Sequence, residues 1–168
     1  MESQNLPERW LRGPVENIIP LLQPVAHALL QAQDEINAMT AGLPDDILWK
    51  TPGGKASIAF HLKHIAGVHD RLLTYAGGNQ LSDQQMQFLK SEGKSDPSIT
   101  LSTLLSDLNK QFDTTLKALA NFSTESLTEP RGVGRKQSPS TVIGLLFHIA
   151  EHTMRHTGQL LVTIAVLK

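Results

Sequence analysis

The sequence predicts an all-α fold, a four-helix bundle with a short extra helix. Apolar residues recur three or four positions apart along four long segments, which is the spacing of one buried helix face. No segment shows the alternation of apolar and polar residues that a convincing β-strand requires. Linkers rich in glycine and proline separate the segments, and they are long enough to allow a crossover connection between helices.

The size and composition of the chain fit one folded domain. Its 168 residues are enough for a substantial core, and hydrophobic and charged residues make up 40% and 18% of them, as in a globular protein. We therefore expect a single helical domain over residues 1–168, in which residues 1–14 form an N-terminal extension.

The first long helix is expected within residues 15–39. Pro20 and Pro24 are unfavourable inside a helix, because each lacks an N–H group and crowds the preceding turn. We therefore expect the regular helix to begin near Leu21, after a turn. A linker rich in glycine and proline, residues 41–55, follows it. The buried face of this helix carries Ile18, Leu22, Val25, Leu29, Ala32 and Ile36.

The second helix is expected over residues 57–75. Ser57 is a suitable N-terminal cap, and Gly77 and Gly78 follow the end of the apolar pattern. Before the next long helix, a short polar helix is expected over residues 83–89.

The remaining chain is expected to hold two more long helices. The third begins at Thr100 or Ser102 and follows a stripe of leucines with one phenylalanine. Residues 123–139 contain two prolines and two glycines and lack a period, so we expect a loop there. The last helix is expected over residues 140–168.

The charge of the chain argues against a nucleic-acid partner. There are 15 basic and 16 acidic side chains, a net charge of -1, whereas binding to phosphates usually requires a basic excess. The local basic cluster of Arg131, Arg135 and Lys136 is interpreted as a solvated loop rather than a phosphate site.

Cysteine is absent, which excludes disulfides and thiolate metal ligands. Any thiol chemistry therefore needs a thiol brought in as a co-substrate. The first 14 residues lack a basic region followed by an apolar run, and the apolar stretches are too short to span a membrane. We therefore expect a cytoplasmic protein without a membrane partner.

Six of the seven histidines fall in two of the predicted helices. His148, His152 and His156 are four residues apart, so successive rings lie above one another, about 6 Å apart at Cβ. Two successive rings can bind one metal ion, but all three span roughly 12 Å and do not share it easily. The alternative interpretation is a polar stripe on a partly exposed helix.

The second helix offers His61, His64 and His69 as a further ligand. His61 and His69 flank its apolar stripe, whereas His64 shares a neighbouring stripe with Arg71 and Tyr75. The spacing alone does not choose among the three histidines. Arg71 and Tyr75 can contact an anionic substrate from that stripe; alternatively, the stem of Arg71 packs on the edge of the bundle.

Two segments resemble the signatures of the DinB-like (YfiT-like) metalloprotein superfamily. The first is SIAFHLKHIAG, residues 57–67, and the second is LFHIAEHTMRHTGQ, residues 146–159, which contains the pattern H-x-x-x-H-x-G-Q. The resemblance extends over nearly the whole chain and includes the helix order and the linker before the second helix.

The resemblance implies a DinB-like four-helix bundle with one divalent metal ion bound by His64, His152 and His156. His61 is an alternative or an addition to His64, and His148 matches a position that is not usually a ligand. Three neutral imidazoles leave a coordination position open, as in catalytic sites. Zinc or nickel is the expected cofactor, while iron and manganese also accept such ligands.

Residues near these signatures have simpler interpretations as well. Gln159 faces the ion or hydrogen-bonds a ligand, or it has a capping or surface role. Glu151 and Arg155 are expected to form an exposed ion pair. Trp10 and Trp49 are expected to anchor the N-terminal segment and the linker.

The resemblance leads to two hypotheses of function. One is a metal-dependent enzyme of the thiol-dependent S-transferase or hydrolase type, acting on a small molecule, with a low-molecular-weight thiol as a co-substrate in the first case. The other is a non-catalytic, metal-binding stress-response module, because a fold does not fix a function. Direct DNA binding is suggested only by the family's name, and the charge argues against it. The resemblance also implies a homodimer through an apolar helix face.

Overall fold

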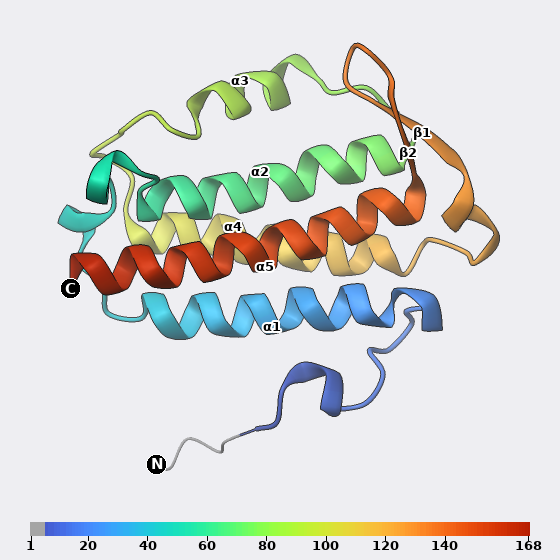
Figure 1. The fold of residues 1–168 in the computed structure, drawn as a ribbon, viewed down its shortest axis with the longest axis horizontal. Coiled ribbons are helices and arrows are strands. Elements are labelled where there is room, and N and C mark those ends of the chain that lie inside the picture. Colours follow the sequence, from blue (N-terminus) through green and yellow to red (C-terminus); the bar gives the residue numbers. More distant parts are fainter. Residues whose placement is uncertain (1–5) are drawn as a thin grey trace.

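The computed structural model describes residues 6–168, so the first five residues of the predicted N-terminal extension lie outside the described residues. Five α-helices and one small hairpin make up the fold (Figure 1). The helices are α1 (Gln23–Thr40), α2 (Ile58–Ala76), α3 (Asp83–Ser91), α4 (Leu101–Leu119) and α5 (Val142–Leu167). Short 3-10 turns lie at Arg9–Leu11, Pro20–Leu22, Asp45–Ile47, Pro52–Gly54 and Glu125–Thr128.

The four long helices form the predicted bundle, and α3 is the predicted extra helix. Helix α1 packs against α4 and α5, and α2 packs against the same two helices, so α1 and α2 lie at opposite corners. Helix α3 returns the chain along α2, so that α2 and α4 run in the same direction and α5 runs against them (Figure 1). This connection is a crossover of the kind that the long linkers allow. The assignment of residues 1–168 to one domain stays a prediction.

The ends of the helices follow local side-chain chemistry. The Ser57 side chain accepts a hydrogen bond from the Phe60 backbone N–H, as predicted for the start of α2, and Gly78 after its end has a φ of +79°. Thr100 caps α4. The last helix begins at Val142 rather than at residue 140, because Thr141 is its cap. Helix α1 begins after a turn near Leu21, as predicted.

The prediction of a loop over residues 123–139 is wrong in part, because these residues include most of an antiparallel hairpin. Strand β1 (Pro130–Val133) pairs with β2 (Ser138–Thr141). Each strand has four residues and together they include proline and glycine, so no alternating pattern marks them. Arg131 donates from Nε to the Ala76 carbonyl at 2.8 Å, which ties the hairpin to the end of α2.

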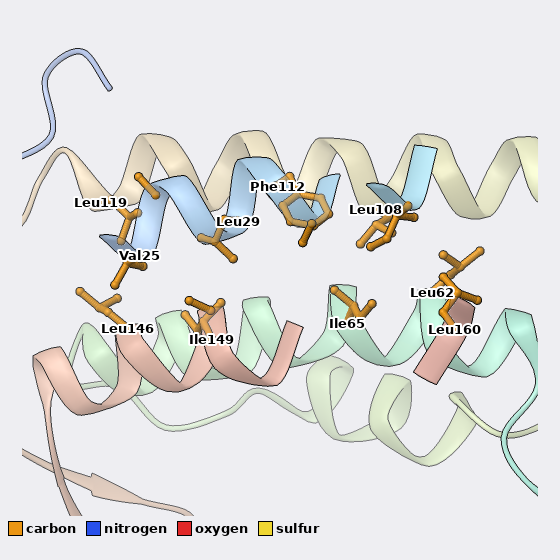
Figure 2. Packing of buried hydrophobic residues seen from close by; sticks show 14 of the residues in the cluster. Val25, Leu29, Leu62, Ile65, Leu108, Phe112, Leu119, Leu146, Ile149 and Leu160 are labelled. Carbon is orange, nitrogen blue, oxygen red and sulfur yellow. The ribbon is translucent and has the colours of Figure 1, made fainter. Parts of the chain in front are cut away.

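The core is a continuous apolar cluster to which all four long helices contribute (Figure 2). Phe112 of α4 is fully buried and is among its largest side chains. Burial of this apolar surface is the main force that holds the helices together. Other members include Val25, Leu29, Leu62, Ile65, Leu108, Leu119, Leu146, Ile149 and Leu160. None of the helices between residues 6 and 168 combines the length and apolarity needed to cross a membrane.

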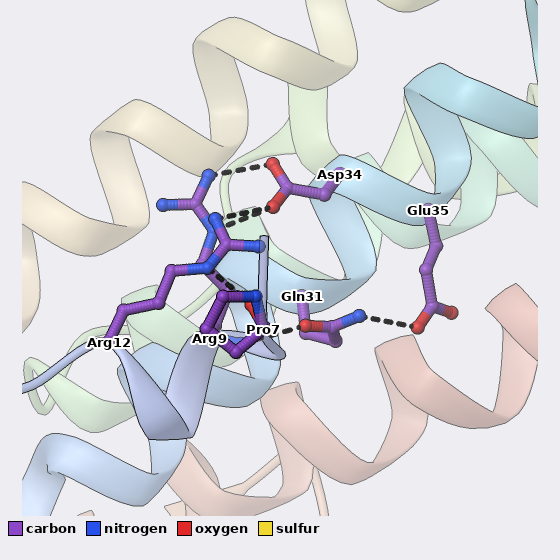
Figure 3. A network of polar contacts seen from close by, with 6 residues as sticks. All are labelled: Pro7, Arg9, Arg12, Gln31, Asp34 and Glu35. Atoms are coloured by element: carbon purple, nitrogen blue, oxygen red, sulfur yellow. Dashed lines mark hydrogen bonds and ion pairs between the residues drawn. The ribbon is translucent and has the colours of Figure 1, made fainter. Parts of the chain in front are cut away.

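The N-terminal segment is attached to α1 by polar contacts (Figure 3). Arg9 donates two hydrogen bonds to the Asp34 carboxylate, at 2.6 and 2.7 Å, and these hold the pKa of Asp34 below its usual range. The prediction that Trp10 anchors this segment is wrong, because its side chain is 62% exposed. Trp49 is partly buried against the core and donates to the Asp96 carbonyl at 3.0 Å.

His69 of α2 is buried inside the bundle between two threonines. Its Nδ1 lies 2.9 Å from Thr115 Oγ1 on α4, and its Nε2 lies 2.8 Å from Thr153 Oγ1 on α5. Burial, together with a smaller effect of the neighbouring His152, lowers the pKa of His69 to about 3. The ring is therefore neutral at pH 7, where it donates through one nitrogen and accepts at the other.

We predict that His69 makes the fold less stable in mild acid. Its pKa is about 3 in the folded protein and about 6.5 in the unfolded chain, so the unfolded chain takes up the proton first and the free energy of unfolding falls as the pH drops below 6.5. When the pH is lowered from about 7.5 to about 5, the free energy of unfolding should fall in both proteins. The fall should be about 2 kcal/mol smaller in His69→Gln than in the wild type, as measured by urea denaturation. His27→Gln, the same change at a partly exposed ring, is the control. An equal loss in wild type and His69→Gln would contradict the prediction.

Candidate metal centre

The two histidine-bearing segments meet where α2 and α5 pack against each other in opposite directions. His64 Nε2 lies 3.0 Å from His152 Nε2, and the ring centroids of His64 and His156 are 4.6 Å apart. Each of the three rings offers a nitrogen, and these nitrogens lie within 4.8 Å of one another. The structure thus brings together the three histidines that the resemblance implies; that they bind a metal ion stays a prediction.

The electrostatics of the cluster favour neutral rings. Burial, together with the smaller effect of the adjacent His64, lowers the pKa of His156 to about 3 and that of His152 to about 4. At pH 7 both rings are therefore neutral and have a lone pair for a ligand. His156 is buried, whereas His64 and His152 are partly exposed, so the cluster lies in the wall of the bundle rather than in its core.

The donor set fits a divalent transition ion. Bonds of 2.0–2.1 Å in a tetrahedral site place ligand nitrogens about 3.3 Å apart, close to the distance between His64 and His152. His152 Nδ1 is buried and has no hydrogen-bond partner among residues 6–168. The other ring nitrogen, Nε2, lies 3.0 Å from His64 Nε2.

Two further histidines lie at the edge of this cluster. His61 Nδ1 is 3.0 Å from His156 Nδ1, and its Nε2 is 3.5 Å from Thr163 Oγ1. His148 belongs to a second group with Glu151 and His152, whose potential ligand atoms also lie within 4.8 Å of one another. His148 Nδ1 is 2.5 Å from Glu151, and Arg155 donates to the same carboxylate at 2.6 Å, so the predicted exposed Glu151–Arg155 pair is present.

Glu92 contacts His64 and has no place in the sequence-based prediction. It follows α3, is 2% exposed, and one of its carboxylate oxygens lies 2.7 Å from His64 Nδ1. The other oxygen accepts a hydrogen bond from Arg71 at 2.5 Å. Arg71 is thus paired inside the protein rather than turned toward a substrate, and Tyr75 is buried in the core. No sequence spacing connects Glu92 to a histidine 28 positions earlier.

A surface pocket of about 600 Å³ lies beside the cluster. His61 forms part of its wall, which links the pocket to His156 through their 3.0 Å contact. Gln159 is exposed and lines the same pocket, so both its ligand-contacting role and its surface role stay predictions. Lys55 and Arg155 bring positive charge to it. A second pocket, of about 510 Å³, has His148 and Glu151 in its wall.

Comparison with known protein families places the chain in one family. The model of the DinB superfamily matches residues 28–160, a range that includes all the candidate ligands. A search of curated proteins gave no match.

Three solved structures share the fold. A protein from Streptococcus pneumoniae is 15% identical, with a TM-score of 0.63 over 85% of this chain and 87% of its own. A conserved protein from Enterococcus faecalis is 17% identical, with a TM-score of 0.67 over 87% of this chain and 96% of its own. YfiT from Bacillus subtilis is 14% identical, with a TM-score of 0.64 over 91% of each chain, and is described as a probable metal-dependent hydrolase with an unusual four-helix bundle topology. At these identities the likeness establishes the fold.

Proposed function

We propose that this chain, which belongs to the DinB superfamily, is a metal-dependent enzyme that binds one divalent ion through His64, His152 and His156. The observation that carries the proposal is the cluster of three imidazole nitrogens within 4.8 Å between α2 and α5. The description of YfiT as a probable metal-dependent hydrolase supports hydrolysis as the reaction type. Transfer of an external thiol is the other reaction that such a site suits.

The ligand set determines what chemistry the site can support. Three neutral imidazoles leave the ion its full charge and an open position, at which the pKa of water falls toward 7 or a thiol is held as thiolate. Because the chain has no cysteine, the nucleophile is water or a thiol that enters with the substrate. Zinc and nickel suit imidazole ligands best, and the ligands alone do not separate them.

The pocket beside the cluster is the proposed substrate site. Val162 gives its wall an apolar part, and Lys55 and Arg155 give it positive charge. Arg155 already pairs with Glu151, whereas Lys55 forms no ion pair with any residue between positions 6 and 168, so we propose Lys55 as the cation that meets a substrate. We therefore propose a small substrate with an apolar body and an anionic group.

His61 is proposed to support a ligand rather than to be one. If His156 binds the ion through Nε2, its Nδ1 carries a proton and donates it to His61 Nδ1, 3.0 Å away. His61 then carries its own proton on Nε2, on the side of Thr163 Oγ1. This arrangement gives His156 a fixed tautomer, which is how a hydrogen-bonded neighbour commonly supports a metal-binding histidine.

We also propose that the protein forms a homodimer and that it binds neither nucleic acid nor a membrane. Helix α5 exposes the large apolar side chains Phe147, Leu161 and Val166, which a second copy can cover. Size-exclusion chromatography with light scattering measures this property independently of the metal.

We predict that the purified, untagged protein contains roughly one equivalent of a transition metal, because three neutral imidazoles form a complete protein ligand set. His64→Ala, His152→Ala and His156→Ala should each lose the metal in elemental analysis. His148→Ala is the control and should keep it, since His148 belongs only to the second group. Loss of the metal in His148→Ala but not in His64→Ala would place the ion in the second group instead.

We predict that His61→Phe retains about one equivalent of metal but binds it roughly 10- to 100-fold more weakly, because only a supporting hydrogen bond is lost. Chelator competition measures the affinity. Complete loss of the metal, as expected for His64→Ala, would make His61 a ligand and contradict the assignment.

We predict metal-dependent turnover in a screen of two substrate classes that carry an anionic group. One class consists of esters and amides, and the other combines low-molecular-weight thiols with electrophiles. Turnover should fall about 100- to 1,000-fold in His152→Ala, because a metal ion supplies several kcal/mol of transition-state stabilisation. A protein that binds its metal tightly and turns over neither class is the non-catalytic module of the alternative hypothesis.

A further inference from the structure

Glu92 is a buried carboxylate with two partners. It is 2% exposed, and removing a carboxylate from water is costly unless charged or hydrogen-bonding groups replace the water. One oxygen, Oε2, lies 2.7 Å from His64 Nδ1, and the other, Oε1, accepts from Arg71 Nη1 at 2.5 Å. Both oxygens are therefore engaged, one with a cation and one with a candidate metal ligand.

The contact with Glu92 determines where His64 carries its proton. A carboxylate paired with an arginine only accepts hydrogen bonds, so the proton of the His64 ring lies on Nδ1. Its Nε2 then presents a lone pair, and this nitrogen is the one that lies 3.0 Å from His152. Glu92 thereby directs the nitrogen that the cluster needs toward the cluster.

Gly67 makes room for this carboxylate. A Cβ at position 67 would lie 2.2 Å from Glu92 Oε1 and 2.5 Å from Arg71 Nη1, distances at which something must move. Glycine is unfavourable inside a helix, and Gly67 lies in the middle of α2. The close approach of the Glu92–Arg71 pair to the α2 backbone explains why this position holds glycine.

The crossover connection delivers Glu92 to this place. Helix α3 lies along α2, where Gln85 donates to Asp70 at 2.9 Å and to Thr74 at 2.7 Å. At its other end Lys63 donates to the Ser91 carbonyl at 2.9 Å, one residue before Glu92. Both ends of α3 are thus fixed on the helix that carries His64.

We propose that Glu92 is a positioning residue that fixes the Nδ1–H form of His64 for metal binding, with Arg71 holding the carboxylate and Gly67 giving it room. This inference rests on the proposed function, since it assigns a role at the same metal site. Under this proposal, the hydrogen bond between Glu92 and His64 connects the α3 segment to the metal site.

The first test is zinc affinity, measured by chelator competition on the full chain. Glu92→Gln should bind zinc roughly 10- to 100-fold more weakly. An amide oxygen turned toward His64 leaves the amide NH₂ against the Arg71 guanidinium, so glutamine satisfies only one partner. Asp34→Asn is the matched control: it removes a carboxylate paired with Arg9 far from the site and should keep wild-type affinity.

Gly67→Ala provides an independent variant in case Glu92→Gln does not fold. The added methyl group displaces the carboxylate, so zinc affinity should again fall roughly 10- to 100-fold. Gly158→Ala adds the same methyl group to α5, where, apart from the adjoining residues and helix backbone, no atom of residues 6–168 lies within 4 Å of the added carbon, and it should leave affinity unchanged. Wild-type zinc affinity in a folded Gly67→Ala or Glu92→Gln protein overturns the proposal.

The second test does not depend on metal binding. Long-range ¹H–¹⁵N NMR of the metal-free protein reports which nitrogen of His64 is protonated; we expect Nδ1 in the wild type and a shift toward Nε2 in Glu92→Gln. Protonation on Nε2 in the wild type overturns the proposal even if zinc binds. A protein that holds His64 in the Nδ1–H form through Glu92 but binds no metal would refute the proposed function while leaving the positioning by Glu92 intact.

Discussion

Buried polar rings need hydrogen-bonding partners, and this need determines how the side chains are arranged between α2 and α5. These helices pack through apolar stripes, yet the same interface encloses several imidazoles, and a buried polar group without a partner is destabilising. His69 meets the requirement through two threonines, and His64 through Glu92. His152 differs, because its Nδ1 is buried without a partner among residues 6–168. Its other nitrogen, Nε2, lies 3.0 Å from His64 Nε2, so the ring that is only partly satisfied belongs to the three-histidine cluster.

The crossover topology is what gives the cluster its surroundings. In an up-down bundle with short loops, α2 would be followed directly by an antiparallel neighbour, and no segment would cover its outer side. Here α3 returns along α2 (Figure 1). Glu92, which follows α3, contacts the His64 ring with its carboxylate. The apolar core around Phe112 lies where α4 and α1 meet the other two helices.

Features determined by local sequence were predictable, and features determined by distant contacts were not. Helical periodicity and caps such as Ser57 predicted the long helices, and the four-residue spacing predicted that His152 and His156 lie on one face. The hairpin escaped prediction because its strands are too short to show a period. Glu92 escaped it because its role depends on how α3 is placed, and the charge on Arg71 gave no indication of its partner. The spacing likewise did not choose between His61 and His64, which are three residues apart on α2; the resemblance indicated His64, and which of the two binds an ion stays a prediction.

Stability alone does not account for the Glu92–Arg71 pair or for Gly67. A buried ion pair seldom contributes more than apolar residues of similar volume, because both charges lose their water. A glycine within a helix costs roughly 0.5–1 kcal/mol relative to alanine. A version of this region with apolar side chains at both positions 71 and 92, and alanine at position 67, is therefore expected to be at least as stable. The chain instead carries two unfavourable features that converge on one nitrogen of His64, and a requirement to orient that ring explains both at once.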